Sequence, residues 1–495
     1  MSEDAQADRA GRGVTGNPPR DTPAEAIDRR VLMVAHTFAP GGGVAVHRPY
    51  GFARHLPDRG WRPTVLAAGA QGAADFDREL VRVTDGRAEV RRAWDPAGLR
   101  PRRRPRAAPP AATLEAGGAP VAQGPDAPKP GRSRRLLRTW VLVPDEAVGW
   151  LPSAVALALR LPPGERPHAV YSTSGPPTNH LVALLLSSRW QVPWVADFRD
   201  PWTEVPNRAR REIYESRSRL AVDRALERAV LARADVIVTV SEEQRRTMLA
   251  LTPGADASKH IVIANGYEPE WVRRGDDPPA RFTVVYTGSF YRAGEEPGPL
   301  FSTLAGLLDS RALQPEDVRV VIATAQHARV AAEAAARGLG DVVEVTPPLP
   351  HEEALALQRS AAVLWLALSE EHGRQGALTA KVFEYMAARR PVLALAPPGS
   401  RAGRLLAETG MGVAVHPSDA AGLAAAVVRL HDDFRSGGGT WHASPEAIAP
   451  YARPVQAGVL ADLLDGLVGL GGKSAAAGGP QRAATGSLAG AAESE

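Results

Sequence analysis

The fold is decided by residues 29–67, which read RRVLMVAHTFAPGGGVAVHRPYGFARHLPDRGWRPTVLA. The apolar run Val31–Ala35 predicts a short buried strand, and Pro63–Ala67 predicts a second strand. Between them lie three glycines, Gly41–Gly43, and a segment over Val46–Leu56 with the apolar spacing of a helix. A strand, a glycine loop, a helix and a second strand form one β-α-β unit, so we expect a parallel sheet.

The same alternation of strands and helices continues on both sides of a predicted linker near 268–280, where residues 276–279 read DDPP. Before the linker, apolar strands are predicted at 169–172, 194–197, 236–240 and 261–264. After it, they are predicted at 282–286, 318–323, 342–345, 362–366, 392–395 and 412–415. We therefore expect an α/β fold with two Rossmann-like domains, at 29–270 and 280–443, whose parallel sheets face each other across a cleft. A helical segment over 444–470 follows the second domain.

Three segments differ from the rest in composition. Residues 1–28 and the Ala/Gly/Ser-rich residues 471–495 are expected to be disordered tails. Residues 98–138 hold nine arginines and one lysine against two acidic residues, and we expect a basic, disordered insertion in the first domain. The net charge of the whole chain is +4, so the remainder is net acidic.

The composition also excludes several classes of protein. The chain has no cysteine, which excludes disulfide scaffolds, thiolate metal sites and cysteine nucleophiles. It has no run of 18 apolar residues, and its first 30 residues lack the apolar core of a secretory signal. We therefore expect a cytoplasmic protein. The histidines show no metal-ligand spacing, so neither a metal nor a bound cofactor is expected.

Parallel sheets bind ligands beyond the carboxyl ends of their strands, so the loops after strands hold the candidate site residues. After the first strand, Gly42 and Gly43 allow backbone N–H groups to approach an anion at the helix N-terminus. This loop lacks the Gly-x-Gly-x-x-Gly and P-loop patterns, and a tight turn without a ligand explains it equally well.

Three charged residues, Asp197, Arg199 and Asp200, follow the strand at 194–197. The two carboxylates can orient Arg199, and any of the three can hydrogen-bond a polar substrate. Asp197 and Arg199 are therefore candidate catalytic residues. The alternative is a salt-bridged loop that is buried against the next domain.

Two further loops could hold a nucleotide diphosphate. Gly288 and Ser289 follow the strand at 282–286, where a turn glycine and a hydroxyl suit a phosphate oxygen. Gly376–Thr379 open a helix on which Lys381 and Glu384 share one face. Loop amides, the helix N-terminus and Lys381 can hold the diphosphate, and Glu384 can accept both hydroxyls of a ribose. Lys381 and Glu384 are therefore candidate catalytic residues as well. The chain has only four lysines but 55 arginines. A lysine at position 381 of such a chain therefore favours a role that needs its compact ammonium group. The alternative is a surface Lys–Glu pair.

These loops, in this order, resemble the family 4 glycosyltransferases of the GT-B type, in the bacterial branch linked to polysaccharide or glycoconjugate assembly. The resemblance extends from about Arg29 to Val468 and is interrupted by the basic insertion. Its carriers are FAPGGG at 38–43 with Arg48, PD at 144–145, STS at 172–174, DFRDPW at 197–202, ADVIVTVS at 234–241, NGY at 265–267, YTGS at 286–289, KVFEYMA at 381–387 and ETGMG at 408–412.

The resemblance implies a retaining transfer of a sugar from a nucleotide-diphosphate sugar, such as a UDP- or GDP-sugar, to a glycan, lipid-linked or small-molecule acceptor. It places the donor on the C-terminal domain and the acceptor on the N-terminal domain, and it implies that the last helix crosses back to the first domain. Glu384 matches the second Glu of the family's Glu-x(7)-Glu motif, which binds the ribose.

The chain departs from the family pattern at position 376, where the first Glu of that motif is replaced by Gly376. The contact to the donor sugar would then come from backbone N–H groups of Gly376, Ala377, Leu378 and Thr379. Ser289, Arg292 and Lys381 are the candidates for the diphosphate, and Asp197 is the candidate for an acceptor contact.

Other functions remain open at this point. A catalytically silent GT-B scaffold is compatible with the Gly376 departure, and a nucleotide-sugar epimerase would use the same fold without an acceptor. A nucleic-acid partner is not expected, because the arginines of 98–138 lack interleaved aromatic residues. We instead expect the insertion to be exposed to solvent, or to make a weak contact with anionic lipid at the inner face of a membrane.

Overall fold

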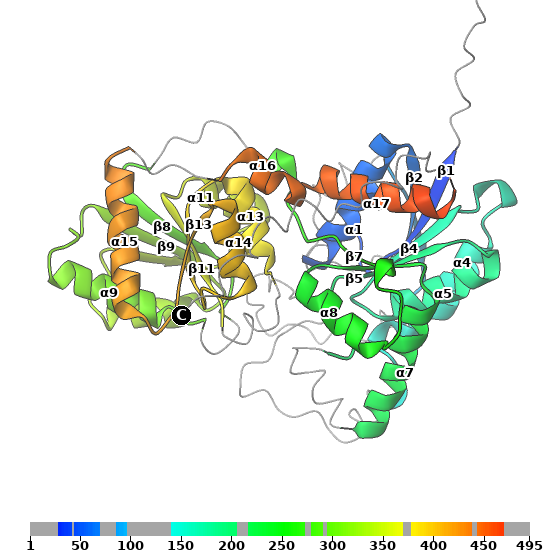
Figure 1. Ribbon diagram of the computed structural model, residues 1–495. Helices are drawn as coiled ribbons and strands as arrows, with labels where there is room; N and C mark the ends of the chain where they lie inside the picture. Colours follow the sequence, from blue (N-terminus) through cyan, green and yellow to red (C-terminus); the bar gives the residue numbers. More distant parts are fainter. Residues whose placement is uncertain are drawn as a thin grey trace, which may run out of the picture.

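The computed structural model describes residues 28–41, 44–69, 86–96, 140–204, 216–272, 279–290, 295–369, 378–437 and 443–469. It consists of two α/β domains, which lie side by side in Figure 1. The predicted basic insertion and, apart from Asp28, the predicted terminal tails lie outside the described residues.

The N-terminal domain is built on a sheet of seven parallel strands in the order β3-β2-β1-β4-β5-β6-β7. The strands are β1 (Arg29–Val34), β2 (Trp61–Ala68), β3 (Glu89–Ala93), β4 (Ala169–Thr173), β5 (Trp194–Phe198), β6 (Val236–Thr239) and β7 (His260–Val262). β1 and β2 pair in parallel from Arg29 beside Trp61 to Val34 beside Leu66, which confirms the predicted β-α-β unit.

Helices cover both faces of this sheet. They are α1 (Val44–His55), α4 (Leu151–Leu159), α5 (Thr178–Trp190), α7 (Arg217–Arg233) and α8 (Glu242–Leu251), with 3-10 turns η1 (Leu56–Arg59), η3 (Glu146–Trp150), η4 (Pro163–Glu165), η5 (Ala257–Lys259) and η6 (Pro269–Trp271). Val31 and Met33 of β1 pack in the core that includes α1, whereas Leu32 and Val34 pack with α4 and α5 on the opposite face. A strand of a parallel sheet that is buried on both faces has a continuous apolar sequence. The burial of β1 on both faces therefore agrees with the predicted parallel sheet.

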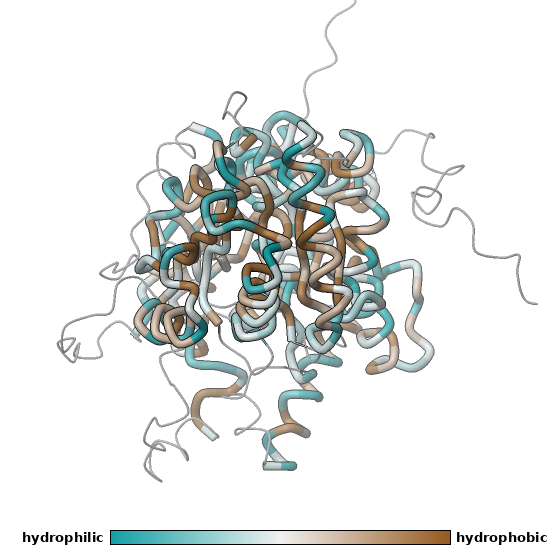
Figure 2. The backbone as a smooth tube through the Cα atoms, turned by 90° about the vertical axis from the view of Figure 1, so that its left-hand side faces the viewer, coloured by the Kyte–Doolittle hydropathy of each residue, from teal (hydrophilic) through white to brown (hydrophobic). Residues whose placement is uncertain are grey.

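The C-terminal domain contains six parallel strands in the order β10-β9-β8-β11-β12-β13. They are β8 (Phe282–Thr287), β9 (Val318–Ala323), β10 (Val343–Thr346), β11 (Val363–Ala367), β12 (Val392–Leu395) and β13 (Gly412–Val415). The helices are α9 (Gly298–Asp309), α10 (His327–Ala335), α11 (His351–Arg359), α13 (Ala380–Ala388), α14 (Arg401–Thr409) and α15 (Ala420–Arg435). In Figure 2, where this domain faces the viewer, hydrophobic stretches concentrate in the interior of the molecule.

The C-terminal segment returns to the first domain, as expected. After α16 (Pro445–Ile448) and η7 (Ala449–Tyr451), the helix α17 (Arg453–Leu467) packs against α1 in Figure 1. At the crossing point, the Tyr267 N–H donates to the carbonyl of Tyr451 at 3.0 Å, and the Arg453 N–H donates to the carbonyl of Tyr267 at 3.0 Å. Gly266 allows this close approach, because a Cβ there would collide with the Tyr451 carbonyl.

The carboxyl edges of the two sheets face each other. In the N-terminal domain, α1 follows β1 and α8 follows β6; in the C-terminal domain, α11 follows β10 and α14 follows β12. Across the interface, α1 contacts α11 and α8 contacts α14. The rings of His47 in α1 and His351 in α11 lie 5.4 Å apart, and Arg404 in α14 forms a 2.5 Å ion pair with Glu243 in α8. Burial, aided by the charges of His351 and Arg453, holds the pKa of His47 well below its usual value. The loops after the strands of both domains therefore meet at this interface.

A buried polar stripe on α7 gives the fold a pH-dependent stability. Arg219 pairs with Asp223 at 3.0 Å, and one turn further Glu227 accepts a 2.5 Å hydrogen bond from Thr203. Burial raises the pKa of Glu227 to about 7, from 4.5 when exposed. The folded state therefore binds this proton more tightly than the unfolded state, so stability falls as the pH rises from about 4.5 to about 7, by about 3 kcal/mol in all.

The Glu227→Gln variant is accordingly expected to be more stable than the wild type at pH 8, and to lack this decline between pH 5 and pH 8. Urea unfolding at several pH values measures the effect, with the exposed Glu165→Gln as the matched control. If the free energy of unfolding of wild type and Glu227→Gln changed in the same way with pH, ionisation of Glu227 would not destabilise the folded protein and this prediction would be wrong.

Candidate functional site

Lys381 and Gly288, two of the predicted donor residues, lie in contact at the carboxyl end of β8. The Lys381 Nζ donates a 2.8 Å hydrogen bond to the Tyr286 hydroxyl and lies 4.4 Å from the centre of the Tyr286 ring. Gly288 has a φ of +129°, and a Cβ there would lie 2.7 Å from Nζ and collide with Cε of the lysine. Gly288 is therefore required both by the turn and by the space that the Lys381 side chain occupies.

Ser289 continues this arrangement on the same loop. Its side chain is buried, with 3% of the residue exposed, and its carbonyl accepts a 3.1 Å hydrogen bond from the Tyr286 hydroxyl. The Tyr286 ring stacks on Phe290 with centroids 4.5 Å apart and lies 4.9 Å from the Trp365 ring. Tyr286 thus links Lys381 to the backbone of the loop and holds the ammonium group at a fixed place beside Gly288.

Glu384 lies one turn further along α13 and is half-buried. The buried Gln358 of α11 donates from Nε2 both to Glu384 Oε2 at 2.9 Å and to Thr287 Oγ1 at 2.8 Å. The Glu384 Oε1 makes no hydrogen bond to any residue that the structure describes. One oxygen of the carboxylate is therefore fixed by Gln358, and the other is available as an acceptor.

The N-terminus of α13 has no side-chain cap from the described residues. Thr379 occupies the N-cap position with extended backbone angles, but its hydroxyl does not cap the helix. The Thr379 Oγ1 is buried and has no hydrogen-bond partner within the described part of the chain. Leu378, which precedes it, is half-buried against the apolar cluster under α13. An uncapped helix N-terminus with an unsatisfied hydroxyl favours an anion at this position.

Other predicted donor residues cannot be placed. Gly42, Gly43, Arg292, Gly376 and Ala377 all lie outside the described residues. Their roles stay predictions. Among the residues that are described, no group of three or more His, Cys, Asp or Glu side chains could hold a metal ion, and independence from metals also stays a prediction.

Asp197 lies near the end of β5, and its side chain is fully buried. The Arg48 Nε and Nη2 donate to its two oxygens at 2.7 and 3.0 Å, and the Tyr171 hydroxyl donates to Oδ2. Arg48 also donates to the carbonyls of Ile263 and Ala264 at 2.9 and 2.8 Å. Asp197 and Arg48 therefore tie α1 to β5 and to the loop after β7 by a buried salt bridge, which lies within the N-terminal domain and not against the next domain.

Arg199 has a structural partner as well. Its Nη1 donates a 2.9 Å hydrogen bond to the carbonyl of Ala45 in the first turn of α1, and Asp200 holds its other nitrogens at 2.7 and 3.1 Å. The Ala45 carbonyl lacks its usual helical donor, because the residue four positions later is Pro49. Arg199 replaces that missing hydrogen bond. The catalytic roles of Asp197 and Arg199 stay predictions, and the contacts give both a structural role.

The sequence did not identify Tyr286 or Gln358 as site residues. Tyr286 stands inside the quoted YTGS motif, and its position two residues before the turn glycine was the available signal. Gln358 lies 26 residues from Glu384 on another helix, and no local pattern links the two. Only the packing of α11 against α13 reveals that contact.

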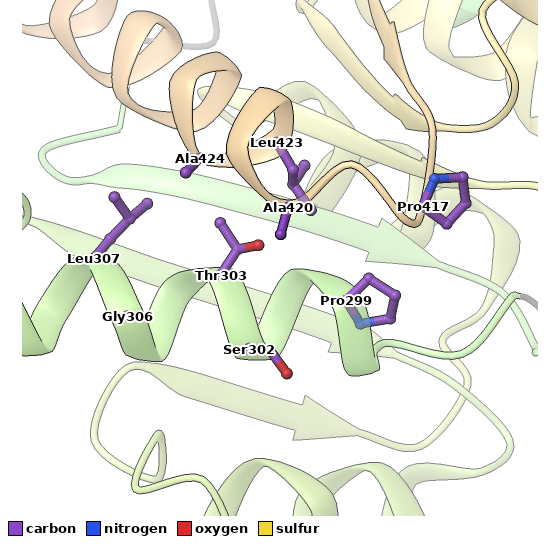
Figure 3. A pocket seen from close by; sticks show the side chains of 9 residues that line it. All are labelled: Pro299, Ser302, Thr303, Gly306, Leu307, Pro417, Ala420, Leu423 and Ala424. Carbon is purple, nitrogen blue, oxygen red and sulfur yellow. The ribbon is translucent and has the colours of Figure 1, made fainter.

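A separate pocket of about 340 Å³ opens between α9 and α15 (Figure 3). Its lining includes Pro299, Leu307, Pro417 and Leu423, and its polar side chains are the hydroxyls of Ser302 and Thr303. No charged side chain lines the pocket. It therefore lacks the cationic groups that a diphosphate needs, and it does not compete with the site at Lys381.

Both domains of the chain match models of known protein families. The chain matches the glycosyl transferase 4-like domain over residues 42–266 and the glycosyl transferases group 1 domain over residues 281–433. These two matches together cover about three quarters of the 495 residues. No curated protein matches the chain.

Solved structures share the fold at low sequence identity. HepE of Anabaena, in complex with UDP-glucose, is 15% identical with a TM-score of 0.53, covering 88% of this chain and 100% of HepE. Sucrose-phosphate synthase of Thermosynechococcus elongatus is 14% identical with a TM-score of 0.55, covering 90% of this chain and 100% of the synthase. A putative UDP-N-acetylglucosamine 2-epimerase of Listeria monocytogenes is 14% identical with a TM-score of 0.50, covering 88% of this chain and 96% of the epimerase.

Each of the two parallel-sheet domains matches a glycosyltransferase domain model. The chain therefore belongs to the two-domain glycosyltransferases of the GT-B type and is an enzyme of glycosyl transfer.

Proposed function

We propose that the protein transfers a sugar, with retention of configuration, from a nucleotide-diphosphate sugar to a hydroxyl group of a glycan, lipid-linked or small-molecule acceptor. The observation that carries this proposal is the contact of the Lys381 ammonium with Gly288, next to the uncapped N-terminus of α13. An ammonium group and a helix N-terminus that no described side chain caps suit, at one place, the diphosphate of a donor.

The proposed roles follow from charge. As the bond between the sugar and the phosphate breaks, the electron pair stays on the diphosphate, and positive charge develops on the sugar ring. Lys381, the Thr379 hydroxyl and the first N–H groups of α13 stabilise the leaving diphosphate. Glu384, with one oxygen held by Gln358, accepts hydrogen bonds from the ribose hydroxyls.

The proton of the acceptor hydroxyl must be transferred to another group as the new bond to the sugar forms. We place it on the departing phosphate, which leaves on the same face of the sugar that the acceptor attacks, so that no covalent enzyme intermediate forms. No pair of carboxylates with the layout of a retaining hydrolase can be read from the sequence.

UDP is the first nucleotide to test, because the HepE structure is described with UDP-glucose. The Listeria epimerase shares the fold, so an epimerase is the second candidate function. The two differ in their products: a transferase releases the nucleotide diphosphate, whereas an epimerase returns an intact nucleotide sugar.

Nucleotide binding at Glu384 is the first prediction of this proposal. One of UDP, GDP, ADP and TDP is expected to raise the melting temperature of the wild type by several degrees, since a ligand at 100 times its Kd adds about 2.7 kcal/mol. The Glu384→Gln variant is expected to bind that nucleotide about 10- to 100-fold more weakly, because a charged hydrogen-bond acceptor is lost. A thermal-shift titration measures both effects.

The matched control is Glu316→Gln, which removes an exposed carboxylate just before β9, at the opposite edge of the same sheet. It is expected to keep the wild-type response. A nucleotide response that is equal in wild type and Glu384→Gln would place the ribose elsewhere. No response to any of the four nucleotides would count against the transferase itself and favour a silent scaffold.

A further inference from the structure

His36 forms a pair with Asp95 at the carboxyl edge of the N-terminal sheet. Its Nε2 lies 3.0 Å from Asp95 Oδ2, and the Asp95 side chain is 8% exposed. His36 follows β1 by two residues, and Asp95 follows β3 by two residues. The pair therefore bridges the ends of two strands on the edge that faces the C-terminal domain.

The position of the imidazole is fixed on several sides. The His36 N–H donates to Asn179 Oδ1 at 3.1 Å, and its carbonyl accepts from the Ala68 N–H at 3.0 Å. The ring meets the buried Trp150 edge-on at a centroid distance of 5.1 Å. A ring held by its backbone, by a carboxylate and by an aromatic neighbour is preorganised for contact with a ligand.

One nitrogen of this ring is left for such a contact. A carboxylate accepts a proton, so in the neutral ring Asp95 fixes the hydrogen on Nε2 and leaves a lone pair on Nδ1. Nδ1 makes no hydrogen bond to any residue within the described ranges, and 20% of the His36 side chain is exposed. By contrast, Asp197, Arg48 and Arg199 near the same edge are buried and hydrogen-bonded to protein partners.

We propose that His36 binds a hydroxyl group of the acceptor through Nδ1 and that Asp95 is a positioning residue for it. The inference rests on the proposed transfer to a hydroxyl acceptor and adds the group that holds this hydroxyl. A hydroxyl donates to a lone pair, whereas a phosphate or carboxylate acceptor group would require a cation in its place. The hydrogen bond positions the acceptor oxygen in the bound state. As the bond between sugar and phosphate breaks, the O–H group turns from Nδ1 to the departing phosphate, which takes the proton as before.

The test compares His36→Gln and Asp95→Asn with wild type in two assays. The first is the nucleotide thermal shift, which reports donor binding. The second is release of nucleotide from the matching sugar donor, with water alone and with a panel of octyl glycosides as acceptor probes. For both variants we expect an unchanged nucleotide shift and about tenfold slower release, seen as a higher acceptor KM where a glycoside serves.

The matched control is His168→Gln. The ring of His168 is held by the protein as well, since its Nδ1 accepts a 3.1 Å hydrogen bond from the Arg30 N–H, but His168 stands at the opposite edge of the same sheet. It is expected to behave as wild type in both assays. Release by His36→Gln at the wild-type rate would overturn the inference, and so would a lowered melting temperature with a weakened nucleotide shift, which would make the pair structural. A wild type that releases no nucleotide from any donor would instead overturn the proposed function.

Discussion

Replacing Lys381 with methionine is expected to lower kcat for sugar transfer about 100- to 1000-fold, the range seen when one group that stabilises a transition-state charge is removed. Methionine keeps much of the length of the side chain but removes the ammonium that lies beside Gly288. The diphosphate then leaves without the ammonium group that is proposed to stabilise it. The rate of nucleotide release from the sugar donor measures the effect.

The fold is expected to survive this change. The contacts of Lys381 include a hydrogen bond to Tyr286 and a cation–π contact with the same ring, which together are worth about 1–2 kcal/mol. The matched control is Lys259→Met, which removes one of the other three lysines from the N-terminal domain. Wild-type turnover in Lys381→Met, with the donor bound normally, would remove Lys381 from the mechanism.

Replacing Asp197 with alanine is expected to destabilise the protein by about 3–5 kcal/mol, the cost of leaving a buried charge without its partner. Arg48 is 2% exposed and would lose the carboxylate that accepts from two of its nitrogens. Tyr171 would lose the same acceptor. Urea unfolding of wild type and variant measures the difference.

Asp58→Ala is the matched control, because Asp58 also pairs with an arginine, Arg87, but both side chains are exposed, by 55% and 42%. Its loss is expected to cost about 1 kcal/mol or less. An Asp197→Ala protein that keeps wild-type stability and loses activity would contradict the structural role. That result would instead support the role of Asp197 as an acceptor contact.

The sequence predicted the core strands well, and physical reasons explain which strands it missed. Strands β1, β8 and β11 are buried on both faces and appear as apolar runs. β3, with the sequence EVRRA, is an edge strand whose side chains are mostly half-exposed, so it has no apolar run to detect. α1 begins at Val44 rather than Val46, since a helix boundary depends on contacts that a local pattern does not contain.

The candidate site was predictable only where its parts are close in sequence. The spacing of Lys381 and Glu384 on one helix indicated a shared face, because residues three positions apart are neighbours on a helix surface. The contact between Lys381 and Gly288 joins residues 93 positions apart, and the Arg48–Asp197 pair joins residues 149 positions apart. Such long-range contacts arise from the order of strands in the sheet, which a single sequence does not specify.

The most direct test of the account is a crystal structure of the protein with the nucleotide diphosphate that the thermal shift selects. The account predicts phosphate oxygens within hydrogen-bond distance of the Lys381 Nζ and the first N–H groups of α13, with the ribose at Glu384. A nucleotide bound elsewhere, for example in the pocket between α9 and α15, with the N-terminus of α13 empty, would contradict it.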